Sequence, residues 1–350
     1  MSCIPNITIN YTTSNPLGLP ASFGGVNLPL MSHHANQNYC TKDGLIQKFD
    51  IILPENIGNA CPLVIYIHGG GFTEGNKTKA YDSLIKRSAI TFLLGNKIAF
   101  ASINYRKVSL GSETKGIIKP LYDCVSALQH LRRWADVYNI DKTKIGLTGH
   151  SAGAGAALWI AFSPDMRLTT GSNQLLKQST KVQAVAALLT QASYDIRKWH
   201  SDIFNNQINI GEVFNIITTL KLQAYNLVDP GLDPITDQNQ IQSQISTYMN
   251  NTFDYKGNQG INLDILDLMT KNDPPIWIEN KTSNKMISGV TSINVLNHHP
   301  LHSQALLNKA ISFTIPGTLD LVSNSTITDN RGTKGYSGKE WHHWMADQLL

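Results

Sequence analysis

The residue whose type and sequence context point most clearly to a chemical role is Ser151, which lies between two glycines in the sequence GHSAG at positions 149–153. The apolar run Lys144 to Thr148 directly before it predicts a β-strand, and the small residues from Ala152 onward predict a helix. A nucleophile on a strand-to-helix turn needs a strained backbone, and glycines there remove the Cβ atoms that would clash. The helix N-terminus that follows favours negative charge. Ser151 is therefore the candidate nucleophile.

A second glycine-rich segment, HGGGF at positions 68–72, closes the apolar run Leu63 to Ile67. Three consecutive glycines after a buried strand leave main-chain N–H groups that point at a ligand and allow its close approach. A phosphate-binding loop is the alternative, but it would need Lys followed by Ser or Thr at its end, and none follows. Together with the amide of Ala152, this segment predicts an oxyanion hole. We expect His68 to stabilise its own loop by hydrogen bonding.

HGGGF, then INYR at positions 103–106, then GHSAG, in this order and spacing, resembles the α/β-hydrolase superfamily, specifically its carboxylesterase and lipase-like branch. The match covers roughly Gln47 to Leu350. The resemblance implies a serine carboxylesterase in which Ser151 forms an acyl-enzyme, and it implies no cofactor and no metal. It also implies that Gly70, Gly71 and Ala152 supply the oxyanion donors, and that an acid and then a histidine follow the nucleophile along the chain.

The catalytic histidine has to be chosen among 11 histidines. The family order places it after the last strand, where His342 and His343 open a final helix in the sequence EWHHW. The resemblance gives His342 the catalytic position, with His343 as an alternative. The rival cluster is His298, His299 and His302 in NHHPLHS, of which His299 is the main competitor. We expect this cluster to line the site without supplying the base.

The acid of the triad departs from the family pattern. No Asp or Glu occurs from Asn280 to Leu319, so the usual position in the loop after the strand Pro275 to Ile278 is empty. Glu279, which ends that strand, is favoured over Asp195, which follows the preceding strand, because many relatives with an HGGG loop carry a structural Asp there. A third reading is that Asn297 stands where the acid once stood, and that an amide or a carbonyl orients the histidine.

These residues need a scaffold, and apolar runs of strand length alternate with helical patterns through most of the sequence. Strands are expected at Gln47 to Leu53, Leu63 to Ile67, Ile98 to Asn104, Lys144 to Thr148, Val182 to Leu189, Pro275 to Ile278 and Ile311 to Ile315. Helices are expected at Ser83 to Leu94, Pro120 to Tyr138, Ala152 to Phe162 and His302 to Ala310. Several strands are nearly all apolar, which is typical of strands covered on both faces. We expect an α/β-hydrolase fold with a mostly parallel central sheet and helices on both faces.

The strand rhythm stops between residues 196 and 272, and an insertion of this length predicts a helical cap over one end of the sheet. Residues 1–45 have no clear period and are expected to wrap the surface, which leaves residues 46–350 as the hydrolase domain. The insertion carries six aromatic residues, which keep an aryl or feruloyl ester in view as the substrate: Trp199, Phe204, Phe214, Tyr225, Tyr248 and Phe253.

Composition limits the function classes. The 350 residues carry 29 Lys and Arg against 25 Asp and Glu, and this net charge of +4 without basic runs argues against a nucleic-acid partner. No apolar run is long enough for a membrane span. The N-terminus lacks the basic and apolar regions of a secretory signal, while the scarcity of charges and the many Asn, Ser and Thr residues favour an exported protein.

The four cysteines have no paired CxxC spacing, which argues against a zinc or dithiol site. Cys61 and Cys124 lie in apolar stretches and are expected to be buried thiols. A disulfide between Cys3 and Cys40 is left open.

Three functions remain in view from the sequence. The leading one is hydrolysis of a small-molecule or polymer-linked carboxylic ester, with short-chain or aryl acyl groups. The second is a serine exopeptidase of the same superfamily, although neither a propeller nor acidic residues for an amino terminus are evident. The third is a non-catalytic binding member of the fold, which only the missing conventional acid supports. The oligomeric state is left open.

Overall fold

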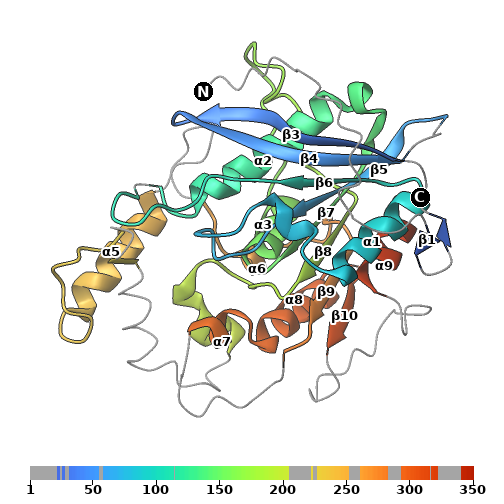
Figure 1. The fold of residues 1–350 in the computed structure, drawn as a ribbon. Helices are drawn as coiled ribbons and strands as arrows, with labels where there is room; N and C mark the ends of the chain where they lie inside the picture. Colours follow the sequence, from blue (N-terminus) through green and yellow to red (C-terminus); the bar gives the residue numbers. More distant parts are fainter. Residues whose placement is uncertain are drawn as a thin grey trace.

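The computed structural model describes most of the chain. The described residues are 22–23, 26–27, 31–54, 58–113, 115–204, 222–223, 227–251, 261–282, 293–315, 317–321 and 340–350. Within them a single eight-stranded sheet forms the centre of the molecule, and helices cover both of its faces (Figure 1). This arrangement is the α/β architecture that the alternation of strands and helices predicts.

The strands of the sheet lie in the order β10-β9-β8-β7-β5-β6-β4-β3. Their bounds are β3 Met31–Lys42, β4 Leu45–Pro54, β5 Cys61–Ile67, β6 Ala99–Ile103, β7 Ile140–His150, β8 Ala184–Leu188, β9 Ile276–Asn280 and β10 Gly317–Leu321. The neighbours from β10 to β6 run parallel, whereas β4 and β3 join antiparallel. Two short strands, β1 Ser22–Phe23 and β2 Val26–Asn27, pair with each other. The parallel strands bring their carboxyl ends to one edge, where ligands bind in open α/β sheets.

Two sets of helices cover the sheet. Their bounds are α1 Leu84–Gly95, α2 Ile118–Arg133, α3 Ala152–Phe162, α5 Gln238–Asn251, α6 Ile265–Leu268, α7 Ile293–Asn297, α8 Pro300–Ser312 and α9 Trp341–Leu349. Alternate residues of β5 separate the two faces: Leu63 and Ile65 pack with α2, α3 and α8, while Val64 and Tyr66 pack with α1 and α9. The predicted strands that are nearly all apolar are thus buried on both sides.

The described end of the N-terminal region differs from the expectation that residues 1–45 wrap the surface. Residues 31–42 form the edge strand β3, which pairs with β4 along its length. The register shifts twice, between His34 and Gln37 and between Asn38 and Cys40. Such bulges insert unpaired residues and break the period of two. A polar edge strand with two irregularities therefore carries no readable alternation in its sequence.

The strand expected at Ile311 to Ile315 is also wrong. Helix α8 continues to Ser312, and the chain leaves it through Thr314, which has a φ of 58°. The strand next to β9 is β10, which begins at Gly317. The apolar residues at the end of the helix belong to its buried side, so a short apolar run was ambiguous between helix and strand.

The region between β8 and β9 was predicted to be a helical cap. Its described part contains the short helical segments η3 Ile196–Lys198 and η4 Trp199–Ile203, then α5 and α6. In Figure 1, α5 lies at the margin of the molecule. Residues 205–221, 224–226 and 252–260 fall outside the described residues, so the full extent of the cap stays a prediction. None of the described helices has the length and hydropathy that crossing a bilayer requires.

The cysteines behave in two ways. Cys61 and Cys124 are buried free thiols, as their apolar surroundings predict. Cys40 is disulfide-bonded. Its suggested partner, Cys3, lies outside the described residues, so the pairing stays a prediction.

Candidate active site

Ser151 sits on a sharp turn between β7 and α3. Its φ of 54° and ψ of −124° are strained for a residue with a side chain. The main-chain N–H of Ser151 donates to the carbonyl of Leu188 at the end of β8, with an N···O distance of 2.9 Å. The carbonyl of Ser151 accepts from the N–H groups of Ala154 and Gly155 as the helix begins. The predicted strand–serine–helix turn is therefore present, with the serine at the carboxyl edge of the sheet.

Two glycines make this turn sterically feasible. A Cβ atom on Gly153 would lie 2.1 Å from the carbonyl oxygen of Ile67, at the end of β5. A Cβ atom on Gly149 would lie 2.4 Å from the carbonyl oxygen of Gly153. Both distances are far below van der Waals contact, and both involve main-chain atoms that cannot move aside. The GxSxG spacing thus lets α3 start directly against β5.

The HGGGF loop lies against the same turn. A Cβ atom on Gly69 would lie 2.6 Å from the carbonyl oxygen of His150. Gly70 and Gly71 have φ values of 110° and 58°, and the Gly70 carbonyl accepts from two main-chain N–H groups that close the loop. Gly71 and Ala152 line one cavity together with Ser151, whereas Gly70 is not among the residues that line it.

Hydrogen bonds and ring stacking hold the loop. The His68 ring stacks on Tyr105 with centroids 4.1 Å apart, and its Nδ1 lies 2.8 Å from the Gly69 carbonyl oxygen. The Tyr105 hydroxyl donates to the His68 carbonyl, at 2.9 Å. Burial lowers the pKa of His68 to about 4, so its ring is neutral near pH 7. His68 therefore stabilises its loop, as expected.

The histidine beside the nucleophile is His298. Its Nε2 lies 2.8 Å from the Ser151 Oγ, within hydrogen-bond reach of a base that takes a hydroxyl proton. Desolvation by burial lowers the pKa of His298 below its ordinary value of 6.5, while a hydrogen bond to the main chain of Asn294 acts in the opposite direction. Because Nε2 faces the serine, Nδ1 is the nitrogen left for that main-chain bond. A neutral ring protonated on Nδ1 accepts the serine proton.

The main chain of His298 is itself fixed from β9. Its carbonyl oxygen accepts from the Asn280 Nδ2 at 3.2 Å and from the Thr282 Oγ1 at 2.9 Å. The Thr282 hydroxyl also reaches the Asn280 Oδ1, at 2.6 Å. Asn280 is fully buried. These contacts tie the loop between α7 and α8 to the strand end, and neither residue stood out in the sequence.

His342, the histidine that chain order favours, lies elsewhere. It belongs to α9, which covers the other face of the sheet together with α1 (Figure 1). Its ring centroid is 5.1 Å from that of Phe92 and 4.3 Å from that of His343. Burial lowers the pKa of His342 to about 4. The Nδ1 of His343 accepts from the main-chain N–H of Glu340 and caps the helix. The structure thus pairs Ser151 with His298 and places His342 and His343 in helix packing and capping.

The other two histidines of the NHHPLHS segment have structural partners. The Nδ1 of His299 accepts from the Leu301 N–H at 3.2 Å and caps α8. His302 is fully buried, and its ring nitrogens contact the Ala192 N–H at 3.1 Å and the Leu296 carbonyl at 3.0 Å. The sequence did carry one signal for this loop. A residue before proline is pushed to an extended conformation, so the chain must leave the helical state just before Pro300.

Neither carboxylate considered for the triad is held at His298. Glu279 is on the same face of β9 as Trp277, towards α1 and α9, and its Oε1 lies 3.1 Å from the Lys281 Nζ. Asp195 caps η3 and binds the Arg197 guanidinium through both of its oxygens. Both expectations followed from the order of the chain. The alternation of side chains along β9 points Glu279 away from His298, and Asp195 is bound to the neighbouring Arg197.

A cavity of about 200 Å³ opens beside the nucleophile. Its described lining is Gly71, Phe72, Thr73, Val108, Ile117, Ser151, Ala152, Gln191, Tyr194, Ile196, Trp199, Leu222, Leu227, Val228, Ile245, Tyr248, Leu263 and Asn297. No charged side chain occurs among these described residues. The Gln191 Nε2 donates to the Asn297 carbonyl at 2.7 Å, which holds the histidine loop at the cavity edge. Asn297 therefore faces the site as a lining residue.

No group of three or more His, Cys, Asp or Glu residues in the described part of the chain is arranged to hold a metal ion. The chemistry that this arrangement supports is a serine attack on an electrophilic carbon, with Gly71 and Ala152 at the developing oxyanion and an uncharged cavity beside it.

Comparison with known proteins gives one family match and several similar structures. The BD-FAE family model matches residues 49–297. A truncated carbohydrate esterase from gut microbiota aligns with a TM-score of 0.52 and 19% identity, over 83% of this chain and 87% of the other. The Est2 esterase from Thermogutta terrifontis aligns with a TM-score of 0.55 and 14% identity, over 89% and 88% of the two chains. These structures share the α/β-hydrolase fold.

Two further comparisons cover less of the other protein. A bifunctional GH43-CE protein from Bacteroides eggerthii aligns with a TM-score of 0.58 and 16% identity, over 91% of this chain and 38% of the other. The "Crystal protein" of Dictyostelium discoideum is 28% identical over 111 residues, which are 30% of this chain and 19% of that curated relative. The match to this relative thus spans about a fifth of its length.

Proposed function

The chain belongs to the BD-FAE family, an α/β-hydrolase-type esterase family, and we propose that Ser151 and His298 act as nucleophile and general base in its ester hydrolysis. As a member of this family the protein is a serine carboxylesterase. The observation that carries the proposal is the 2.8 Å contact between the Ser151 Oγ and the His298 Nε2 at a strained strand-to-helix turn.

The proposed reaction has two halves. His298 takes the Ser151 hydroxyl proton on Nε2 while Oγ bonds to the ester carbon, and the N–H groups of Gly71 and Ala152 bind the resulting oxyanion. The tetrahedral intermediate collapses, its bond to the alcohol oxygen breaks, and His298 gives its proton to the leaving alcohol. Water then attacks the acyl-enzyme, loses its proton to His298, and releases the carboxylic acid with Ser151 restored.

Among the described residues, the partner of the His298 ring besides Ser151 is the main chain of Asn294. A carboxylate normally fixes the histidine tautomer and stabilises the imidazolium. Here a carbonyl can fix the tautomer through a bond to the ring of His298, but a neutral dipole stabilises the imidazolium less than a full negative charge does. From the described residues we therefore propose a Ser–His dyad supported by Asn294 and Asn280, with slower proton transfer than in a full triad.

The cavity suggests the acyl side of the substrate. A water needs about 10–15 Å³ of such space, so about 200 Å³ holds much more than an acetyl group. The lining is mostly apolar and carries no charged side chain in its described part, which disfavours acyl chains that end in a carboxylate or an amine. We propose esters of uncharged short-chain or aryl acids, the feruloyl type included. A polymer-linked alcohol, such as a carbohydrate, is proposed for the other side of the ester, because one of the aligned structures is a carbohydrate esterase from gut microbiota.

The test is a panel of p-nitrophenyl esters and feruloyl esters run beside Ser151→Ala. Removing the nucleophile should lower kcat by about 10⁴-fold or more, with circular dichroism showing an intact fold. A fluorophosphonate should label the wild-type protein and not the variant. Turnover that survives Ser151→Ala would refute the proposal, and a folded protein that neither turns over nor labels would favour the non-catalytic alternative.

A further inference from the structure

A strap of chain connects β6 to α2 and passes the cavity. We use the name strap for residues 104–117, of which Thr114 lies outside the described residues. Val108 and Ile117 of the strap line the cavity. The main-chain N–H of Val108 donates to the carbonyl of Phe72 at 2.9 Å, which joins the strap to the HGGGF loop. The shape of the strap therefore bears on the shape of the cavity.

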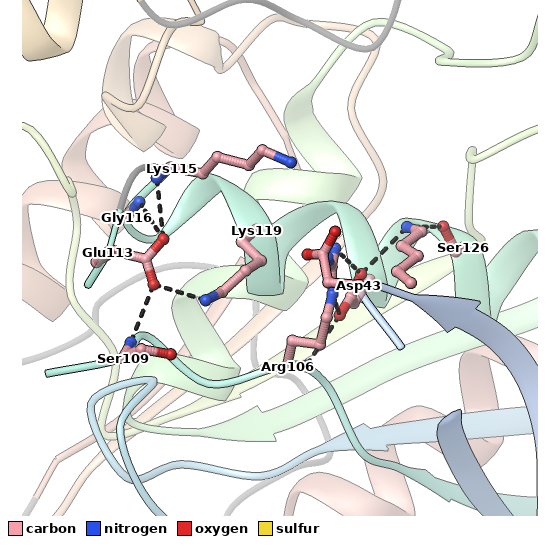
Figure 2. A network of polar contacts seen from close by, with 10 residues as sticks. Asp43, Arg106, Ser109, Glu113, Lys115, Gly116, Lys119 and Ser126 are labelled. Atoms are coloured by element: carbon pink, nitrogen blue, oxygen red, sulfur yellow. Dashed lines mark hydrogen bonds and ion pairs between the residues drawn. The ribbon is translucent and has the colours of Figure 1, made fainter. Parts of the chain in front are cut away.

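The start of the strap is anchored by a buried ion pair. Arg106 donates to Asp123 of α2 through its main-chain N–H at 2.9 Å and through Nε and Nη2 at 2.8 Å each. Asp43 at the β3–β4 turn adds an ion pair to Arg106 (Figure 2). Lys42, next to it, adds an ion pair to Asp123. These contacts fix where the strap leaves the sheet.

The middle of the strap folds around one carboxylate. Glu113 is only 3% exposed. Its Oε1 accepts from the N–H groups of Lys115 and Gly116, at 2.9 and 3.1 Å, and its Oε2 accepts from the Ser109 N–H and the Lys119 Nζ, at 2.9 and 2.6 Å (Figure 2). Burial alone would raise the pKa of Glu113, but these hydrogen bonds outweigh it and lower the pKa. The carboxylate stays charged, and its hydrogen bonds hold Ser109, Lys115, Gly116 and Lys119 together around it.

The C-terminal end of the strap contacts helix α5 and supports it. The Tyr248 hydroxyl donates to the Lys115 carbonyl, at 3.0 Å. A Cβ atom on Gly116 would lie 1.8 Å from that hydroxyl oxygen, and the φ of Gly116 is 55°. The Tyr248 side chain therefore packs at a position where only glycine leaves room. Tyr248 and Ile245 of α5 line the cavity. One wall of the cavity thus rests on the backbone that Glu113 holds.

We propose that Glu113 is a positioning residue for acyl selectivity, because it holds the strap so that Tyr248 seats on Gly116 and fixes the spacing of the cavity walls. This inference rests on the proposed esterase function. As a consequence, the binding of esters with uncharged acyl groups longer than acetyl depends on the contact between Tyr248 and Gly116. An acetyl group leaves most of the cavity unfilled and depends on it less.

The test compares kcat/KM for p-nitrophenyl hexanoate and p-nitrophenyl acetate in Glu113→Gln and Gly116→Ala. One buried methylene contributes about fourfold to binding, so losing the contact of two methylenes lowers the hexanoate-to-acetate ratio about sixteenfold. We expect that fall in Gly116→Ala, and about threefold in Glu113→Gln, whose amide NH₂ cannot accept from Ser109 or Lys119. The fall should lie in KM for hexanoate more than in kcat.

Asp165→Asn is the matched control. Asp165 also closes a loop, by accepting from the N–H groups of Thr180 and Arg167 and from the Ser179 hydroxyl. None of these residues lines the cavity. This variant should lower the melting temperature as Glu113→Gln does, and it should leave the hexanoate-to-acetate ratio at the wild-type value.

Hydrogen exchange of α5 provides a second readout that needs no turnover. Glu113→Gln should raise the exchange rate of amides in residues 238–251, and Asp165→Asn should not. An unchanged ratio with unchanged exchange in α5, or a ratio that falls equally in the control, would overturn the inference. If the wild-type protein hydrolyses no ester, the proposed function fails separately, and the exchange experiment still decides whether Glu113 seats α5.

Discussion

The nucleophile and its neighbouring histidine are held by different means. Ser151 is fixed by backbone geometry: a positive φ, and glycines whose missing Cβ atoms let β5, β7 and α3 approach. His298 is fixed by hydrogen bonds from Asn280 on β9, from Thr282 just after that strand, and to the main chain of Asn294 on α7. The first arrangement is set by glycines in two short motifs, whose missing Cβ atoms allow close main-chain contacts, whereas the second depends on side chains that no local motif marks. Changes on the nucleophile side should therefore disrupt folding and activity together, and changes on the histidine side should affect activity more selectively.

Gly153→Ala should give the largest combined effect. Its new Cβ atom meets the Ile67 carbonyl at 2.1 Å, so α3 must shift away from β5. We expect a loss of about 2–4 kcal/mol in the free energy of unfolding, measured by guanidinium titration, together with loss of most esterase activity. Gly95→Ala is the control, because a Cβ atom there meets nothing within 4 Å. Equal stability of the two variants would show that backbone packing does not hold the nucleophile.

Asn280→Ala should give a smaller and more selective effect. It removes the donor to the His298 carbonyl and the acceptor for Thr282, so the histidine loop loses its tie to β9. We expect kcat to fall by about 10–100-fold, which corresponds to the loss of about 1–3 kcal/mol when a buried hydrogen-bond partner is left unsatisfied, while KM changes little. Asn173→Ala removes a similar local contact, to the Leu175 N–H, far from the site. A fall in Asn280→Ala no larger than in Asn173→Ala would contradict the positioning role.

The smallest expected effect is a shift of the acid limb of the pH–activity profile, which the pKa of His298 sets. His298 acts as a base only when neutral, and burial lowers its pKa below 6.5. Its neutral form therefore persists as the pH falls past 6.5, and activity should be lost only below the lowered pKa. The acid limb of kcat/KM against pH, measured with p-nitrophenyl butyrate, should have its midpoint below 6.5. A midpoint above 6.5 would indicate a base that a carboxylate stabilises in its charged form.

The contrast between how Ser151 and His298 are held also explains which parts of the site could be predicted from the sequence. The turn at Ser151 and the glycine loop at Gly71 depend on neighbours in the chain, so their motifs were sufficient to place them. The pairing of Ser151 with His298 depends on how the β9 end meets the α7–α8 loop, and no local pattern encodes that contact. Chain order favoured His342, but its helix packs on the opposite face of the sheet.

The acid shows this limit most clearly. The absence of Asp and Glu from Asn280 to Leu319 was visible in the sequence and indicated an unusual triad. The direction of Glu279 depended on the register of β9, and the Asp195–Arg197 pair depended on the turn at η3. The edge strand β3 was missed for a related reason, since its two register shifts hide the alternation of buried residues.

The most direct test of the account compares His298→Asn with His342→Asn. His298 is partly buried and His342 is buried, and burial lowers the pKa of both rings, so each variant removes a desolvated imidazole from a different place in the fold. Loss of the base should lower kcat/KM for p-nitrophenyl butyrate by about 10³-fold in His298→Asn. His342→Asn should lower the melting temperature and leave kcat/KM of the folded protein within about threefold of the wild type. A larger loss of kcat/KM in folded His342→Asn than in His298→Asn would contradict the Ser151–His298 pair.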